Sequence, residues 1–134
     1  MSLTGSCLCG SVRFEVTEPF ERLTACHCTS CKKISGGAGT VSGRAPTGAI
    51  RILAGQEVLR TYQPDEGSGK TFCSECGSNL FGGGWPDAPH ASVRLSALDG
   101  PFDLPPARHI YVRSVAPWET LPDDGAERFD VRGS

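Results

Sequence analysis

The chain has 134 residues, a formal net charge of −2 and a hydrophobic fraction of 38%. This length predicts one domain with its own hydrophobic core. The acidic balance disfavours nucleic acid or an anionic membrane as a partner, and no apolar run approaches the roughly 20 residues that a membrane span needs. No signal peptide is recognisable, so we expect a cytoplasmic protein. The composition, with Gly 17 and Pro 10, favours a turn-rich, mostly β protein with few or no long helices.

Several short segments alternate apolar and polar residues, as half-buried strands do. In the first of them, residues 11–16, the alternation places Val12, Phe14 and Val16 on one face. The same pattern predicts further strands over residues 49–53 and 58–62, and the alternation recurs over 90–98 and 109–114. Residues 70–73 lead into a cysteine pair and residues 79–81 lead out of it.

The remaining segments carry weaker signals. One helical turn is expected near residues 30–34. The glycine-rich segment 35–43 lacks the Gly-Lys-Ser/Thr ending of a phosphate-binding loop, so we expect a flexible loop beside a site. The tail from Glu119 is polar and acidic and is expected to be a loose extension.

Seven cysteines are the most informative feature of the sequence. An odd number cannot form only intramolecular disulfides, and nothing points to export into an oxidising compartment. Inert buried thiols and disulfides are therefore weaker readings than metal ligation. The clustered spacing favours metal for all seven: Cys7, Cys9, Cys26, Cys28, Cys31, Cys73 and Cys76.

The spacing suggests how these cysteines divide. A short Cys-x(1–2)-Cys loop can present two thiolates to one ion, and it often needs a residue with positive φ just after the second cysteine. Glycine adopts that conformation at no steric cost, and two of the pairs are followed by Gly10 and Gly77, whereas the central cluster has no such glycine. We therefore favour a closed structural zinc site of four cysteines and a second zinc on three cysteines with one position open. The structural set is Cys7, Cys9, Cys73 and Cys76, and the second set is Cys26, Cys28 and Cys31.

A rival division remains open at this point. It combines Cys28 and Cys31 with Cys73 and Cys76, as in an ordinary zinc ribbon, and leaves the other three cysteines without partners. Spacing narrows the choices without fixing them.

Residues beside the central cluster add further candidates. His27 is a possible fourth ligand, but consecutive side chains in extended backbone point to opposite sides, so we expect it to face away from the ion. Lys32 and Lys33 either offset the charge of the thiolates or lie solvated at the surface. His90 and His109 flank predicted strands, and the sequence assigns neither a role.

Five blocks in fixed order extend these motifs over about residues 5–122: GSCLCGSVRFEV, CHCTSCKKISG, TFCSECGSNLF, VRLSALDG and HIYVRSVAPW. In these blocks the chain resembles the glutathione-dependent formaldehyde-activating (GFA) family, also named after centromere protein V. The resemblance implies a compact, zinc-ribbon-like β fold, with a single zinc-binding domain over residues 1–122 and a polar tail over 123–134. It also implies the favoured division, with two zinc ions per chain and Cys26, Cys28 and Cys31 holding the catalytic one.

The resemblance implies a carbon–sulfur lyase of the S-(hydroxymethyl)glutathione synthase type, acting on glutathione and formaldehyde or a related thiol and aldehyde. The open position would receive the substrate sulfur, which then attacks the aldehyde carbon. The alternative is a non-catalytic zinc-stabilised binding module or a glutathione or thiol carrier. A redox enzyme resembling methionine sulfoxide reductases would need a free cysteine of low pKa, and the favoured division leaves none.

One departure from the family pattern concerns the pocket. Family members often carry a Phe and then a Trp after the central cluster, where this chain has Gly39 and Ser42. Aromatic side chains at those positions could form a wall of a substrate pocket.

Overall fold

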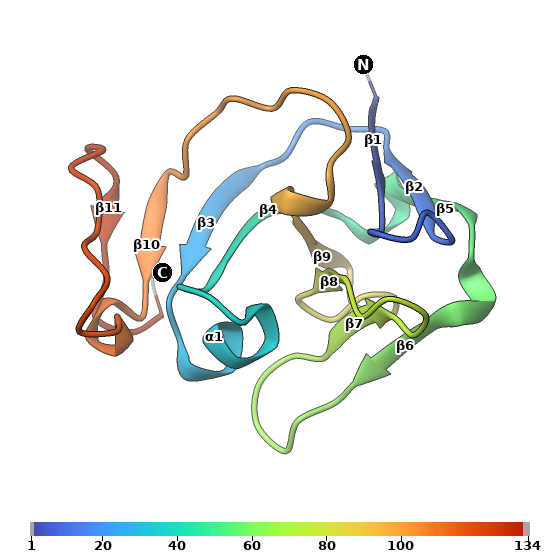
Figure 1. Cartoon of the computed structure of the whole chain (residues 1–134). Coiled ribbons are helices and arrows are strands. Elements are labelled where there is room, and N and C mark those ends of the chain that lie inside the picture. Colours follow the sequence, from blue (N-terminus) through green and yellow to red (C-terminus); the bar gives the residue numbers. More distant parts are fainter. Residues whose placement is uncertain (1, 133–134) are drawn as a thin grey trace.

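The computed structural model describes residues 2–132, which form two β-sheets and one short α-helix. The smaller sheet has the order β1-β2-β5, with bounds Leu3–Ser6, Arg13–Val16 and Ile50–Ala54. The larger sheet has the order β11-β10-β3-β4-β9-β8-β7-β6 and curves across the molecule in Figure 1. In that order its strands are Glu127–Arg128, Arg108–Ile110, Arg22–Cys26, Thr40–Pro46, His90–Arg94, Asn79–Gly82, Lys70–Cys73 and Leu59–Tyr62.

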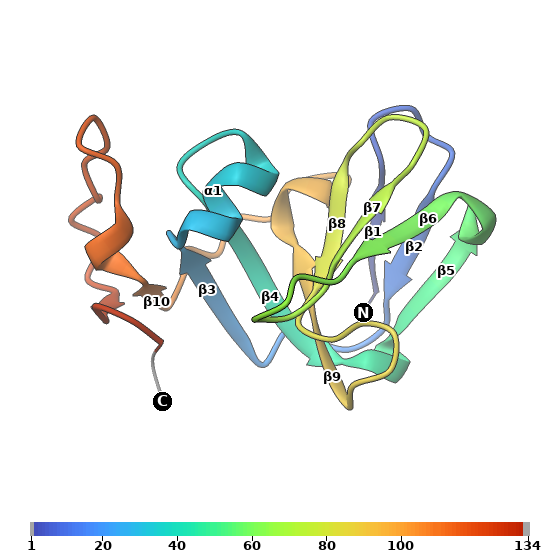
Figure 2. The same ribbon diagram turned by 90° about the horizontal axis from the view of Figure 1, so that it is seen from below.

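The helix α1, Thr29–Ser35, follows β3 directly and lies beside the ends of β3 and β4 (Figures 1 and 2). Four 3-10 turns complete the structure: Thr47–Ala49, Gln56–Val58, Leu95–Ala97 and Val112–Ser114. The prediction of a mostly β fold with few or no long helices is thus confirmed. Along the described chain, no helix is both long and apolar enough to cross a membrane.

The hydrophobic core lies where the small sheet packs against the middle of the large one. Val12, Phe14 and Val16 are fully buried, which confirms the predicted inner face of β2. The Phe14 ring meets Phe81 of β8 edge to face, with centroids 4.9 Å apart. Burying an aromatic or aliphatic side chain of this size stabilises the fold by about 1.5–3 kcal/mol. The core therefore fixes β2 and β8, the strands next to the first and third cysteine motifs.

Some sequence expectations were wrong at element boundaries. The segment 35–43 is not a loop throughout, because residues 40–43 open β4. The strand expected over 109–114 ends at Ile110, since Tyr111 has a φ of 57° and a 3-10 turn follows. The strand expected over 90–98 likewise ends at Arg94.

The tail is not the loose extension that its composition suggested. β11 pairs in parallel with β10, and Phe129 N–H donates to the His109 carbonyl at 2.9 Å. Tyr111 N–H donates to the Val131 carbonyl at 3.0 Å. Because an uncovered strand edge leaves N–H and C=O groups unpaired, the tail stabilises β10 by pairing with it, and polar side chains suit that exposed position. Residues 133 and 134 of the predicted tail lie outside the described residues.

Candidate functional site

Four cysteines from two distant parts of the sequence lie together in one group. The Sγ atoms of Cys7, Cys9, Cys73 and Cys76 all lie within 4.8 Å of one another. Cys7 and Cys9 Sγ are 3.6 Å apart, and Cys9 and Cys73 Sγ are 4.0 Å apart. Four sulfurs around a zinc at about 2.3 Å would be about 3.8 Å apart, whereas a disulfide needs about 2.05 Å. The group therefore fits a tetrahedral ion such as zinc.

The backbone around this group favours thiolates. Gly10 and Gly77 have φ values of 80° and 81°, as expected for the residue after each cysteine pair. The Val12 N–H donates to Cys7 Sγ at 3.2 Å. A hydrogen bond with the Ser78 side chain is the main cause that lowers the pKa of Cys76 to about 5, while burial raises the pKa of Cys73 to about 11. A bound cation would stabilise the Cys73 thiolate, which burial disfavours.

The second group contains Cys26, Cys28 and Cys31, whose Sγ atoms also lie within 4.8 Å of one another. Cys26 ends β3, and Cys28 caps α1 by accepting from the Cys31 N–H at 3.3 Å. A hydrogen bond with Cys26, followed by contacts with Thr40 and Cys28, lowers the pKa of Cys31 to about 5. The same bond raises the pKa of Cys26. One thiolate is thus available at neutral pH, and three sulfurs at this separation fit a metal ion.

The structure brings together both sets of the favoured division. Cys28 and Cys31 group with Cys26, so the structure does not bring together the four cysteines of the rival zinc-ribbon division. Within residues 2–132, no fourth Cys, His, Asp or Glu joins the three-cysteine group.

The three-cysteine group opens onto a cavity of about 790 Å³. Alternate residues of several strands face this cavity, and Cys26, Thr24 and Arg22 of β3 are an example. The four-cysteine group, in contrast, does not line it. Because Cys9 is exposed and Cys7 lines a second cavity, the two groups differ in their number of sulfurs and not in access. Four sulfurs complete a tetrahedral shell, whereas three leave one position open.

Arg94 is a member of this site that the sequence did not suggest. Its side chain is 6% exposed, and its guanidinium donates to Asn79 Oδ1 at 3.1 Å and Ser42 Oγ at 2.9 Å. Burial lowers the pKa of Arg94, while the nearby Cys31, Cys26 and Cys28 raise it. The buried cation thus balances part of the thiolate charge. Its sequence signal was only a charged residue inside the predicted strand 90–98.

The two positions where family members often carry aromatics have other roles here. Gly39 has a φ of 144°, and a Cβ there would collide with the Cys26 carbonyl oxygen. Ser42 is buried and accepts a hydrogen bond from Arg94. Gly39 therefore cannot carry a larger side chain, and Ser42 presents to the cavity a hydroxyl bound to Arg94 in place of an aromatic ring.

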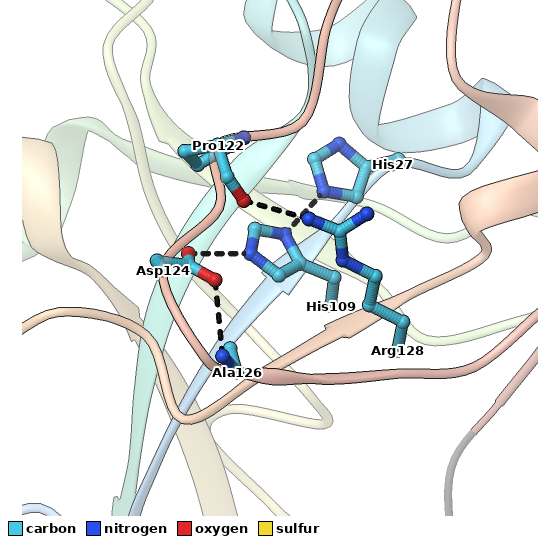
Figure 3. A network of polar contacts seen from close by, with 6 residues as sticks. All are labelled: His27, His109, Pro122, Asp124, Ala126 and Arg128. Carbon is cyan, nitrogen blue, oxygen red and sulfur yellow. Dashed lines mark hydrogen bonds and ion pairs between the residues drawn. The ribbon is translucent and has the colours of Figure 1, made fainter.

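His27 does not join the three-cysteine group, in line with the expectation that it faces away from an ion held there. Its ring lies beside that of His109 (Figure 3). Its Nε2 lies 2.9 Å from Nδ1 of His109, and His109 Nε2 lies 2.8 Å from Asp124 Oδ2. The hydrogen bond with His109 is the main cause that lowers the pKa of Asp124, and burial lowers the pKa of His27. This row of side chains links the tail to the backbone that carries Cys26 and Cys28.

The other basic candidates lie at different places. His90 lines the cavity and lies 3.2 Å from Glu21 at the surface. Lys32 Nζ donates to the Ser114 carbonyl, which ties α1 to the turn after β10, and Lys33 is exposed. Neither lysine lines the cavity, within the part of the chain described.

We predict that Asp124→Asn loosens the tail without unfolding the domain. The amide can still accept a hydrogen bond from His109, but the carboxylate charge is lost and the bond weakens. Hydrogen–deuterium exchange at the Phe129 amide should become several-fold faster, and the neighbouring exposed Asp123→Asn is the matched control. Equal exchange in the two variants would show that the carboxylate does not hold the tail.

Comparisons with known proteins are consistent with this site. The family model described as "Glutathione-dependent formaldehyde-activating enzyme" matches residues 2–114. A relative from Halomonas elongata, named "Putative glutathione-dependent formaldehyde-activating enzyme", is 35% identical over 130 residues, which cover 88% of this chain and 80% of the relative. A relative of the same name from Talaromyces marneffei is 32% identical over 78 residues, which cover 57% of this chain and 42% of the relative.

The fold has a counterpart among solved structures. A crystal structure of a Rhodobacter sphaeroides protein superposes with a TM-score of 0.60 at 22% identity, covering 94% of this chain and 98% of the other. The family match spans all seven cysteines, which lie between residues 7 and 76. The chain therefore belongs to the glutathione-dependent formaldehyde-activating enzyme family.

Proposed function

We propose that the chain is a zinc-dependent enzyme that adds a small thiol to a small aldehyde, with glutathione and formaldehyde as the pair that the family name indicates. The product would be S-(hydroxymethyl)glutathione, and the reverse reaction is a carbon–sulfur lyase reaction. The observation that carries the proposal is a group of three cysteines, one ligand short of a tetrahedral shell, that lines a cavity of about 790 Å³, whereas the other group already has four cysteines.

The two groups have different roles in this proposal. Cys7, Cys9, Cys73 and Cys76 hold a structural zinc, and Cys26, Cys28 and Cys31 hold the catalytic one. The three cysteines would leave one position of a bound zinc open, and the ion would supply there the charge that lets a thiol lose its proton without a dedicated base. In the net reaction the S–C bond forms, the carbonyl π bond breaks, and the aldehyde oxygen gains the proton that the thiol lost.

The residues around the three cysteines prepare this chemistry. Cys28, as the cap of α1, accepts the Cys31 N–H, which holds the two sulfurs on one side of the helix start. Arg94 places a buried positive charge beside the three thiols. Together they reduce the repulsion that a fourth sulfur meets when it approaches.

The test follows hydroxymethyl exchange between formaldehyde and glutathione by NMR. In Cys28→Ser the exchange should fall by more than about tenfold, because even loss of a group outside the ligand set typically costs metal sites 10–100-fold. Ser35→Ala, at the exposed end of α1, is the control and should exchange at the wild-type rate. Equal rates in wild type and Cys28→Ser, with the four-cysteine site fully loaded, would refute the proposal.

A further inference from the structure

The end of the cavity away from the cysteines is lined by arginines that the reaction above does not use. β3 and β4 pair so that Arg22 lies opposite Arg44, while Cys26 lies opposite Thr40 at the other end. Arg108 of β10 lies opposite Thr24 in the same sheet. Arg22, Arg44 and Arg108 all line the cavity, with Arg22 and Arg44 at its far end and Arg108 between them and the cysteines.

Arg108 is buried with part of its hydrogen-bonding capacity unused. Arg108 is only 8% exposed, and its Nε donates to Thr24 Oγ1 at 3.0 Å. Among residues 2–132, its Nη1 is buried and meets no hydrogen-bond partner. A buried donor without an acceptor is costly, and a bound oxyanion would supply the missing acceptor.

Positive charge is concentrated in this cavity in a chain that is acidic overall. The chain has 13 Lys and Arg residues and 15 Asp and Glu residues. Six arginines and one lysine line the cavity, against the single carboxylate of Glu66. Among the described side chains, Arg22, Arg44 and Arg108 take part in no ion pair. Like charges placed directly opposite on paired strands, as Arg22 and Arg44 are, destabilise a sheet that has no ligand to balance them.

We propose that Arg22, Arg44 and Arg108 form an oxyanion subsite that binds the acidic end of the substrate whose sulfur reaches the three-cysteine group. This inference rests on the proposed function only in that the sulfur of the substrate binds at the three cysteines. Arg22 and Cys26 are four residues apart on one strand, which corresponds to about 13 Å. The arginine and cysteine side chains extend from these backbone positions into the cavity, so the substrate has to span less than this backbone distance. The substrate class is therefore an elongated thiol with a carboxylate, or a phosphate, at the far end.

The test measures binding separately from turnover. Zinc-loaded protein is titrated by calorimetry with glutathione and with glutathione diethyl ester, which keeps the thiol and masks both carboxylates. Wild type should bind the free acid at least about tenfold more tightly than the ester, because bidentate guanidinium–carboxylate bonds are among the strong ones. In the Arg22→Gln/Arg44→Gln variant this preference should disappear. Arg51→Gln on β5, which lies in the other sheet, should keep it.

Two further measurements separate the possible outcomes. The ligand-free Arg22→Gln/Arg44→Gln variant should melt at a higher temperature than wild type, since opposed charges are removed. Titration with inorganic phosphate at low ionic strength tests the other source of an oxyanion. If phosphate binds wild type more tightly than the double variant, and glutathione shows no preference over its ester, the subsite takes a phosphate-bearing thiol.

The subsite and the reaction can fail independently. Turnover of glutathione and formaldehyde with equal affinity for acid, ester and phosphate in wild type and variant would overturn the subsite and leave the reaction standing. An acid–ester preference that the double variant loses, in a protein without turnover, would support the subsite and refute the reaction.

Discussion

Replacing Cys73 by serine is expected to leave the chain without a stable fold. Cys73 is fully buried, belongs to the hydrophobic core and sits 4.0 Å from Cys9 across 64 residues of sequence. A structural zinc contributes about 10–16 kcal/mol of apparent binding free energy, which is comparable to the net stability of a whole domain at about 5–15 kcal/mol. Loss of one of four ligands therefore removes much of what holds the N-terminal strands to the middle of the chain.

The measurement combines metal content with near-ultraviolet circular dichroism and a thermal melt. Cys28→Ser is the matched control, because it also exchanges a clustered cysteine for serine but lies outside the four-cysteine group. We expect the control to keep its tertiary signal and one bound ion, and Cys73→Ser to lose both. A wild-type melting temperature in Cys73→Ser would show that this group does not bear a structural ion.

Local sequence signals predicted the parts of this structure that depend on one strand or one turn. Val12, Phe14 and Val16 are all buried because a period of two in the sequence is a period of two in the strand. Gly10 and Gly77 have positive φ because the chain must turn directly after each cysteine pair. These features needed no knowledge of the distant chain.

The features that sequence missed depend on contacts between distant segments. β3 and β4 carry Arg22, Thr24 and Ser42 on the face toward the cavity. Their buried face is short and made mostly of small residues, with Leu23 and Ala25 in β3 and Gly43 and Ala45 in β4, so the apolar stripe is weak. β10 pairs in parallel with β3 across more than 80 residues, and Asp124 reaches His109 from the tail. No local pattern encodes such pairings.

The grouping of the cysteines lies between these cases. Spacing identified every short cysteine motif, yet it allowed two divisions, because a Cys-x-x-Cys loop can serve either site. The choice depends on where β3 ends relative to β7, and this is a property of the sheet order β3-β4-β9-β8-β7. Three strands, β4, β9 and β8, lie between Cys26 on β3 and Cys73 on β7, so each motif meets only its own partners.

Arg94→Met is expected to weaken metal binding at the three-cysteine group by about 10–100-fold while leaving the four-cysteine group loaded, since groups outside the ligand set typically contribute that much to affinity. Methionine keeps much of the side-chain volume but removes the buried charge near Cys31 and the two hydrogen bonds to Ser42 and Asn79. The affinity is measured by competition with a chromophoric chelator. Arg51→Met, an exposed arginine paired with Glu15 in the other sheet, is the control.

Proton release distinguishes an electrostatic role of Arg94 from loss of packing. Metal binding displaces protons from thiols. Hydrogen bonds and nearby charge lower the pKa of Cys31 to about 5, so this thiol has already lost its proton at pH 7. Without Arg94 the pKa of Cys31 should rise, so calorimetry in buffers of different ionisation enthalpy should detect more protons released per ion. Arg94→Lys keeps the charge and should restore the wild-type proton count even where its shorter reach lowers affinity. An unchanged proton count in Arg94→Met would mean that Arg94 supports the site only by filling space between β4 and β9.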